Sequence, residues 1–181
     1  ATHYATTFLD FAAYEQNQYN LIKSGKNWYG DMFESSSLSK NFTFPFANIC
    51  NDSLVKVNAE LIGRSSSASH FIIASGSSQN TTNIAPTSGY QNDYAKKGTA
   101  SFSFLPSSSV VNISINYYQN GNTEAIGWLD YIEVSAWRKL IMSGNQMVFR
   151  NPYVSGSGNV VEYTVSNADN NLKIWDIYNP L

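Results

Sequence analysis

The chain has 181 residues, of which 43% are hydrophobic and 14% aromatic, so it can bury the core of one domain. Only 13% of its residues are charged, the net charge is -2, and no stretch concentrates Lys or Arg, which argues against nucleic-acid binding. Cys50 is the single cysteine and therefore excludes an intrachain disulfide.

The beginning of the chain shows no targeting or membrane segment. Residues 1–4 lack the basic start and following apolar run of a signal peptide, so we interpret the sequence as a mature piece of its protein. No apolar run approaches the roughly 18 residues that a membrane helix needs.

Residues 1–33 are predicted to form an arm that packs on the rest of the chain. Between Phe8 and Ile22 the apolar residues fall near one face of a short helix, but alternation also fits the first part, so both forms stay open. Gly25 and Gly30 bracket a turn that would place the side chain of Trp28 onto the remaining domain and bury it.

Beyond residue 33 the dominant hydrophobic period is two. The clearest case runs from Val111 to Tyr117, where apolar residues alternate with Asn and Ser. Strict alternation gives a strand one buried face and one solvated face, which is typical of antiparallel sheets. The predicted strands cover residues 42–46, 55–61, 71–74, 100–105, 111–117, 126–137, 146–149, 160–165 and 172–177.

Turn residues separate these strands. Asn120-Gly121 is a hairpin signal because both residues accept a positive φ. The stretch from Ser77 to Gly98 is polar and is interrupted by Gly and Pro, so it is interpreted as a long surface loop. Pro45 cannot donate a ladder hydrogen bond and therefore predicts that strand 42–46 lies at a sheet edge or is bulged at its end.

These patterns predict an all-β protein with one antiparallel β-sandwich. The sandwich would cover residues 34–181, with the arm of residues 1–33 packed against it. A jelly-roll or galactose-binding-like sandwich fits better than an immunoglobulin fold, because the Cys and Trp spacing of the latter is missing.

The ionisable residues do not form a catalytic or metal-binding pattern. Cys50 is interpreted as a small buried residue, and a Cys50–His70 dyad is the less favoured alternative. Asp130, Glu133 and Asp176 do not have the spacing of a calcium loop, and two histidines cannot form a zinc signature. We therefore predict no catalytic residue, no metal site and no cofactor.

Aromatic residues gather in three short segments, at residues 23–30, 127–134 and 174–180. Such side chains either pack in the core or stack on sugar rings, and packing is the favoured interpretation. Buried Trp28 and Trp128 would support packing, whereas two coplanar exposed aromatic rings would support sugar binding.

As an ordered set, these segments resemble the region that precedes the peptidase domain in PorU-like proteins, the gingipain-type cell-surface cysteine peptidases of the type IX secretion system. The matching positions are Ser24, Gly25, Trp28, Tyr29, Gly30, Phe33, Trp128, Asp130, Tyr131, Arg138, Phe149, Trp175, Asp176 and Pro180. Asp31 stands where the family usually has Glu, and Tyr178 replaces a Thr.

The resemblance implies that this chain is a non-catalytic accessory or interaction domain of a PorU-like signal peptidase, with the matching residues in structural or interface roles. It implies a location at the cell surface or outer membrane of a Gram-negative bacterium of the Bacteroidetes. The implied partners are the protein's own C-terminal peptidase domain and other secretion-system or cell-surface proteins. The alternative is a carbohydrate-binding β-sandwich module of a secreted hydrolase, with a glycan as its partner.

Overall fold

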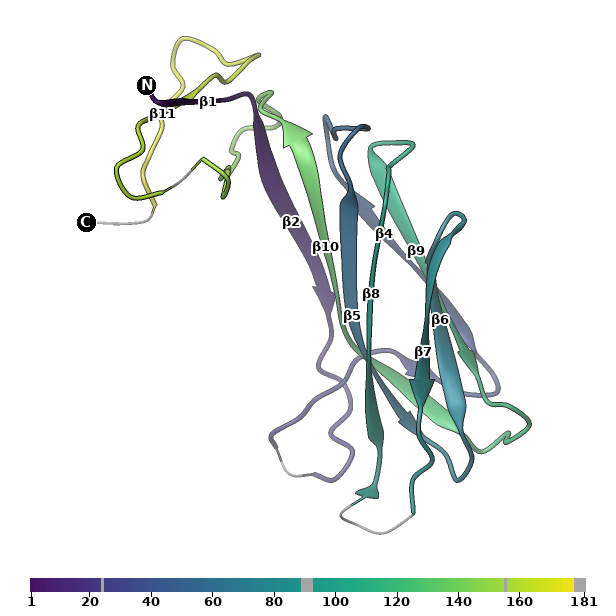
Figure 1. Cartoon of the computed structure of the whole chain (residues 1–181). Helices are drawn as coiled ribbons and strands as arrows, with labels where there is room; N and C mark the ends of the chain where they lie inside the picture. The colour runs from purple at the N-terminus through teal and green to yellow at the C-terminus, as the bar shows by residue number, and fades with distance from the viewer. Residues whose placement is uncertain (24, 89–92, 155, 178–181) are drawn as a thin grey trace.

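The computed structural model describes residues 1–23, 25–88, 93–154 and 156–177, and its main body is formed by two β-sheets packed face to face (Figure 1). The first sheet contains, in spatial order, β2 (Thr7–Glu15), β10 (Ile126–Lys139), β5 (Val55–Arg64) and β8 (Lys96–Phe104), and β3 (Met32–Phe33) also pairs with β10. The second contains β4 (Ser39–Pro45), β9 (Val110–Tyr118), β6 (Ser69–Ser75) and β7 (Ser78–Ile84) in that order. All strand pairs in both sheets are antiparallel.

The strand order is that of a jelly roll. If β2 and β4 to β10 are numbered 1 to 8 along the chain, the sheets read 1-8-3-6 and 2-7-4-5. Successive strands thus alternate between the sheets except at the β6–β7 hairpin, as two interleaved Greek keys require. The predicted all-β antiparallel sandwich is confirmed.

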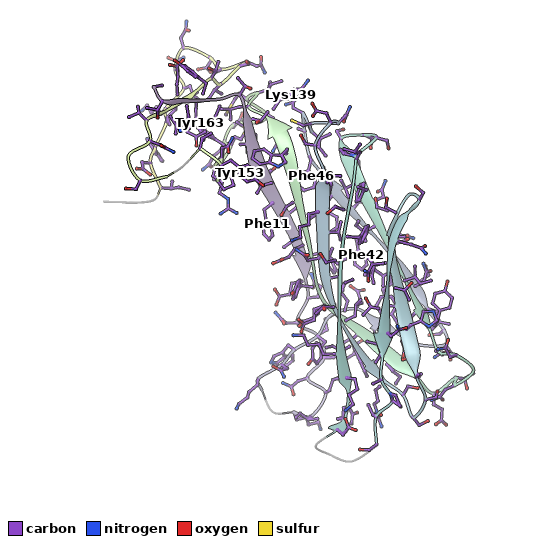
Figure 2. The ribbon with its side chains drawn as sticks, in the orientation of Figure 1. Phe11, Phe42, Phe46, Lys139, Tyr153 and Tyr163 are labelled. Carbon is purple, nitrogen blue, oxygen red and sulfur yellow. The ribbon has the colours of Figure 1, made fainter. Side chains whose placement is uncertain are left out.

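The core lies between the inward faces of the two sheets. Val111, Ile113, Ile115 and Tyr117 are each at most 2% exposed, so the alternation of this segment marks one buried face of β9 as predicted. Figure 2 shows Phe42 of β4 within the sandwich, where it joins the same buried cluster. Side-chain burial of this kind supplies most of the free energy that opposes chain entropy.

One long side of the sandwich is closed by direct contact between β7 and β8. The Thr82 hydroxyl donates to the Thr99 carbonyl at 3.2 Å, which joins strands of different sheets. A Cβ atom on Gly98 would lie 2.5 Å from the Thr82 side chain, so the close approach requires glycine at this position.

Beyond one end of the sandwich, the first strand and part of the segment that follows β10 form a smaller unit (Figure 1). There β1 (His3–Ala5) pairs in parallel with β11 (Val161–Tyr163). The ring of Phe149 contacts those of Phe8 and Tyr163, with centroids 6.5 and 5.2 Å apart, and thereby connects this unit to β2.

The N-terminal segment differs from the helical alternative. Residues 7–15 form β2, an edge strand of the first sheet, because its pairing with β10 satisfies the backbone along nine residues. The predicted edge position of strand 42–46 is confirmed, since β4 is the edge strand of the second sheet and ends at Pro45. The division of the chain at residue 33 stays a prediction.

Three further predictions were wrong. The stretch from Ser77 to Gly98 is not one loop, because β7 covers Ser78–Ile84 and β8 begins at Lys96. Segments 146–149 and 172–177 are not strands. Asn120 and Gly121 do have positive φ angles of 48° and 89°, but they connect β9 to β10 in the other sheet rather than closing a hairpin.

Candidate functional site

Two of the motif segments, about 100 residues apart in the sequence, lie side by side, because the first pairs with the second, which is part of β10. The Gly30 N–H donates to the Leu129 carbonyl at 2.7 Å, and the Leu129 N–H donates to the Asp31 carbonyl at 2.9 Å. Phe33 then pairs with Gly127 in the β3–β10 ladder. The structure therefore brings together the segments that carry Trp28 to Phe33 and Trp128 to Tyr131.

The loop that carries the first segment is tied to itself before it reaches β10. Tyr19 and Tyr29 exchange backbone hydrogen bonds of 2.8 and 2.9 Å. Gly30 is packed so closely that a Cβ atom would lie 2.8 Å from the side chain of Gln16. Gly25 has a φ of +73°, which favours glycine in this turn.

Asp130 lies at a β-bulge. The register between β10 and β5 shifts between Leu129 and Tyr131, which pair with Leu61 and Glu60, so Asp130 is the extra residue. A bulge leaves one residue unpaired and changes the direction of its side chain. Here the bulge places the Asp130 carboxyl against the buried carboxyl of Glu60, and the two form a hydrogen bond.

This carboxyl pair changes the ionisation of the groups around it. Burial, the hydrogen bond to Glu60 and the negative charges of Glu60 and Glu15 raise the pKa of Asp130 to about 6, against a partial opposing effect of Lys97. A hydrogen bond between two carboxyls needs a proton, and the raised pKa of Asp130 favours its protonated form. Lys97 forms an ion pair with Glu60, which raises the pKa of the ammonium group.

Asp130, Glu60 and Lys97 together form the bulge cluster, and two tyrosines border it. Burial is the main cause of the raised pKa of the Tyr29 and Tyr131 phenols, and the charges of Asp130 and Glu60 act in the same direction. Tyr29 comes from the N-terminal loop, so the cluster joins that loop to β5, β8 and β10. No group of three metal-binding side chains occurs in the described ranges. Asp130 and Glu60 form a hydrogen bond with each other, and Glu60 also forms an ion pair with Lys97.

A second polar cluster centres on Arg138 near the other end of β10. Its guanidinium donates to the Ala47 carbonyl at 2.5 Å, to the Asp10 carboxylate at 2.7 Å and to the Ser143 hydroxyl at 2.8 Å. It also lies over the ring of Phe8, 5.1 Å from the centroid. Because Arg138 is only 9% exposed, these contacts compensate for a buried charge.

The remaining motif residues are dispersed. Trp128 is 4% exposed and is part of the packing, whereas Trp28 is 43% exposed, so the predicted burial of Trp28 was wrong. Trp175 is 77% exposed and lies in the C-terminal segment with the exposed Asp176. Ser24 and Pro180 lie outside the described residues.

Sequence reasoning missed the partners of these motif residues. Glu60 and Lys97 complete the bulge cluster, and Asp10 completes the Arg138 cluster. Glu60 had no local signal, because it stands at a polar position of the alternation from Val55 to Leu61 and is nevertheless buried. Lys97 had no signal either, since it lies on a separate strand.

Cys50 and His70 do not form a dyad. The Cys50 N–H donates to the Trp137 carbonyl near the C-terminal end of β10. His70 lies on β6, where it pairs with Tyr118 of β9 and stacks on the ring of that tyrosine with centroids 4.6 Å apart. These positions lie at opposite ends of the sandwich. Burial raises the pKa of the Cys50 thiol, which is the opposite of what activates a nucleophile.

Fold and site together define a jelly-roll β-sandwich domain in which two polar clusters, around Asp130 and Arg138, connect the long strand β10 to neighbouring segments. No protein-family model matches the sequence, and a comparison with curated proteins finds no significant match. Among solved structures, the chain is similar to the latent, dimeric PorU of Porphyromonas gingivalis, with a TM-score of 0.76 and 18% identity. The match covers 93% of this chain but only 16% of the PorU chain, and it shows a shared fold.

Two carbohydrate-binding modules also match. One is a CBM36 in complex with calcium and xylotriose, with a TM-score of 0.41 and 10% identity over 68% of this chain and 87% of that chain. The other is the CBM36-1 domain of a xylanase from the hindgut metagenome of Trinervitermes trinervoides, with a TM-score of 0.42 and 11% identity over 70% and 95% of the two chains. At these TM-scores the likeness supports no conclusion about function.

No helix in the described part of the chain has the length and apolar character needed to cross a membrane.

Proposed function

We propose that this chain is a non-catalytic accessory domain that precedes the peptidase domain of a PorU-like protein. The observation that carries the proposal is the fold match over 93% of this chain to 16% of a much longer PorU chain. In this proposal the parent is a gingipain-like cysteine peptidase of the type IX secretion system, at the cell surface or outer membrane of a member of the Bacteroidetes.

The chemistry of the described residues supports a non-catalytic role. Cys50 is 5% exposed, its pKa is raised by burial, and His70 lies at the far end of the sandwich. The acidic pair of Asp130 and Glu60 is engaged by Lys97 and by its own hydrogen bond. The chain would act on protein secretion through contacts to its own peptidase domain and to other surface proteins.

A peptidase assay on the 181-residue chain tests this role. Peptides with Arg, Lys or Ala before the scissile bond should be hydrolysed at the background rate, both by the chain and by Cys50→Ala. Hydrolysis above background that disappears in Cys50→Ala would contradict the proposal, because the chain would then contain its own nucleophile.

A carbohydrate-binding module is the second candidate, and one observation favours it. Tyr153, labelled in Figure 2, is 82% exposed. Its ring stacks nearly parallel on the ring of Trp137, with centroids 5.5 Å apart. The outer ring face of Tyr153 is therefore open to a sugar ring. Binding on a glycan array that is lost in Tyr153→Ala and kept in Tyr153→Phe would favour this candidate over the first.

A further inference from the structure

The edge strand β4 exposes main-chain hydrogen-bonding groups along its outer side. The Phe46 N–H donates to the Ser109 carbonyl, and the Leu38 carbonyl accepts from the Tyr117 N–H. The main-chain N–H and C=O groups of the even-numbered residues in this segment therefore point toward β9. Because the main-chain groups of successive strand residues point to opposite sides, the N–H and C=O groups of Asn41 and Thr43 point away from β9, toward the open edge of the sheet. In the described ranges β9 is the only strand that pairs with β4.

A groove runs beside this edge. It has a volume of about 760 Å³ and lies between β4 and β2, the edge strands of the two sheets. Its apolar lining includes Phe42, Phe44 and Ala12, and the ring of Tyr14 lies 4.8 Å from that of Phe42. The groove is open to solvent along its length, so it is accessible to an extended chain rather than shaped to enclose a small molecule.

The polar groups of the groove neutralise one another. Asp31 accepts a hydrogen bond of 2.6 Å from the Tyr14 hydroxyl and forms an ion pair of 3.4 Å with Lys40. A partner that enters the groove therefore meets no unbalanced charge at this end. Neutral polar and apolar side chains fit it better than charged ones.

The other edges are less available. β7 and β8 approach each other closely along the opposite side, around Thr82 and Gly98. On β2, the Leu9 N–H donates to the Arg150 carbonyl at 2.9 Å, and the Phe11 N–H is bonded by the side chain of Asp10 at 2.8 Å. The outer side of β4 thus combines unpaired main-chain groups with an open apolar groove.

We propose that β4 is a strand-addition site that binds an extended segment of a partner polypeptide as a fifth strand of the second sheet. Main-chain hydrogen bonds to Asn41 and Thr43 would hold the segment, and every second side chain would enter the groove over Phe42 and Phe44. The seven residues of β4 span about 23 Å at about 3.3 Å per residue. Pro45 ends the site because it has no N–H to donate.

A segment with free side chains fits this site better than a second copy of β4. Phe42 and Phe44 are already buried in their own sandwich, at 8% and 5% exposure. In a β4–β4 dimer those inward side chains would stay in their own cores and could not fill the groove. The occupant is therefore a segment that alternates apolar and polar residues and is not part of a folded sheet. Such binding does not depend on a peptidase domain in the parent protein.

The test uses a fluorescent, acetylated and amidated peptide that copies residues 110–118, the alternating segment that pairs with the inner side of β4. We expect saturable binding to the full 181-residue chain by fluorescence anisotropy. Thr43→Pro removes one outward N–H without removing a ladder hydrogen bond and should weaken binding about tenfold or more. The matched control Thr43→Val loses the hydroxyl contact to Asn112 but keeps the N–H, and should bind like the parent chain.

A second measurement makes the result independent of the folding of the variants. In the unaltered chain, the peptide should slow amide hydrogen exchange at Asn41 and Thr43. Three results would overturn the proposal: no saturable binding, equal binding by Thr43→Pro, or protection confined to other strands. A concentration-dependent dimer that Thr43→Pro abolishes would also overturn it, since the occupant would then be a second copy.

Discussion

Replacement of Asp130 by asparagine tests the account of the bulge cluster. The introduced amide would be permanently neutral and could still donate a hydrogen bond to Glu60, so Asp130→Asn imitates the protonated form of the native residue. In the native chain the pKa of Asp130 is raised to about 6 from an ordinary value of 3.8, chiefly by burial and by the contact with Glu60.

The sign of the effect follows from linkage. Because the pKa is higher in the folded state, the folded chain binds more protons than the unfolded chain between about pH 4 and pH 6. The contribution of Asp130 to stability is therefore fully present below the unfolded pKa and is lost as the pH rises through the folded pKa. A shift of about two units corresponds to at most about 3 kcal/mol, and solvent screening of this partly exposed group reduces it to about 1 kcal/mol.

The assay is urea unfolding of the native chain and of Asp130→Asn at several pH values from 4 to 8. We expect similar stability near pH 4, and a variant that is about 1 kcal/mol more stable than the native chain above pH 7. Glu124→Gln also removes one carboxylate, but at an exposed position, and is the matched control that should not reproduce the stabilisation above pH 7. The reasoning is refuted if Asp130→Asn is as stable as or less stable than the native chain at every pH.

Three further experiments test the packing. Trp128→Ala should reduce the free energy of unfolding by about 3–5 kcal/mol, whereas Trp28→Ala should reduce it by less than about 1.5 kcal/mol, because Trp128 is 4% and Trp28 43% exposed; thermal melts of both variants decide this. Arg138→Met should lower the free energy of unfolding, measured in urea, by about 3–5 kcal/mol, because it leaves Asp10 without its ion pair. Adding Asp10→Leu should recover part of this loss. A double variant whose loss equals the sum of the two single losses would contradict this. Gly98→Ala should lower the melting temperature, since its Cβ atom would lie 2.5 Å from Thr82, and an unchanged melting temperature would contradict the close β7–β8 approach.

The fold could be predicted from the sequence where burial alone sets the pattern. From Val111 to Tyr117 the alternation marks β9, and Pro45 marks an edge strand, because these signals are local. β7 was missed because its exposed positions carry Gln, Asn and Thr, while only Thr82 and Ile84 are buried. A strand of this composition is stabilised by pairing with β6, which a local pattern cannot reveal.

The candidate site was predictable only in part. The resemblance singled out Asp130, but its partners Glu60 and Lys97 lie on other strands and meet it through the register and bulge of the sheet. Trp28 was expected to be buried because bulky aromatic residues usually are, yet the backbone bonds of Tyr29 and Gly30 hold its loop instead. Such tertiary pairings override the preference of a single side chain.

The central proposal is that the chain is a non-catalytic domain attached to a peptidase domain. The most direct measurement expresses the parent protein's remaining portion separately and assays peptide hydrolysis by that portion, by the 181-residue chain and by their mixture, with association followed by analytical ultracentrifugation. We predict that all cysteine-dependent activity belongs to the remaining portion and that the two pieces form a complex. A parent whose remaining portion has no peptidase activity, or a chain that hydrolyses peptides through Cys50, would contradict the account.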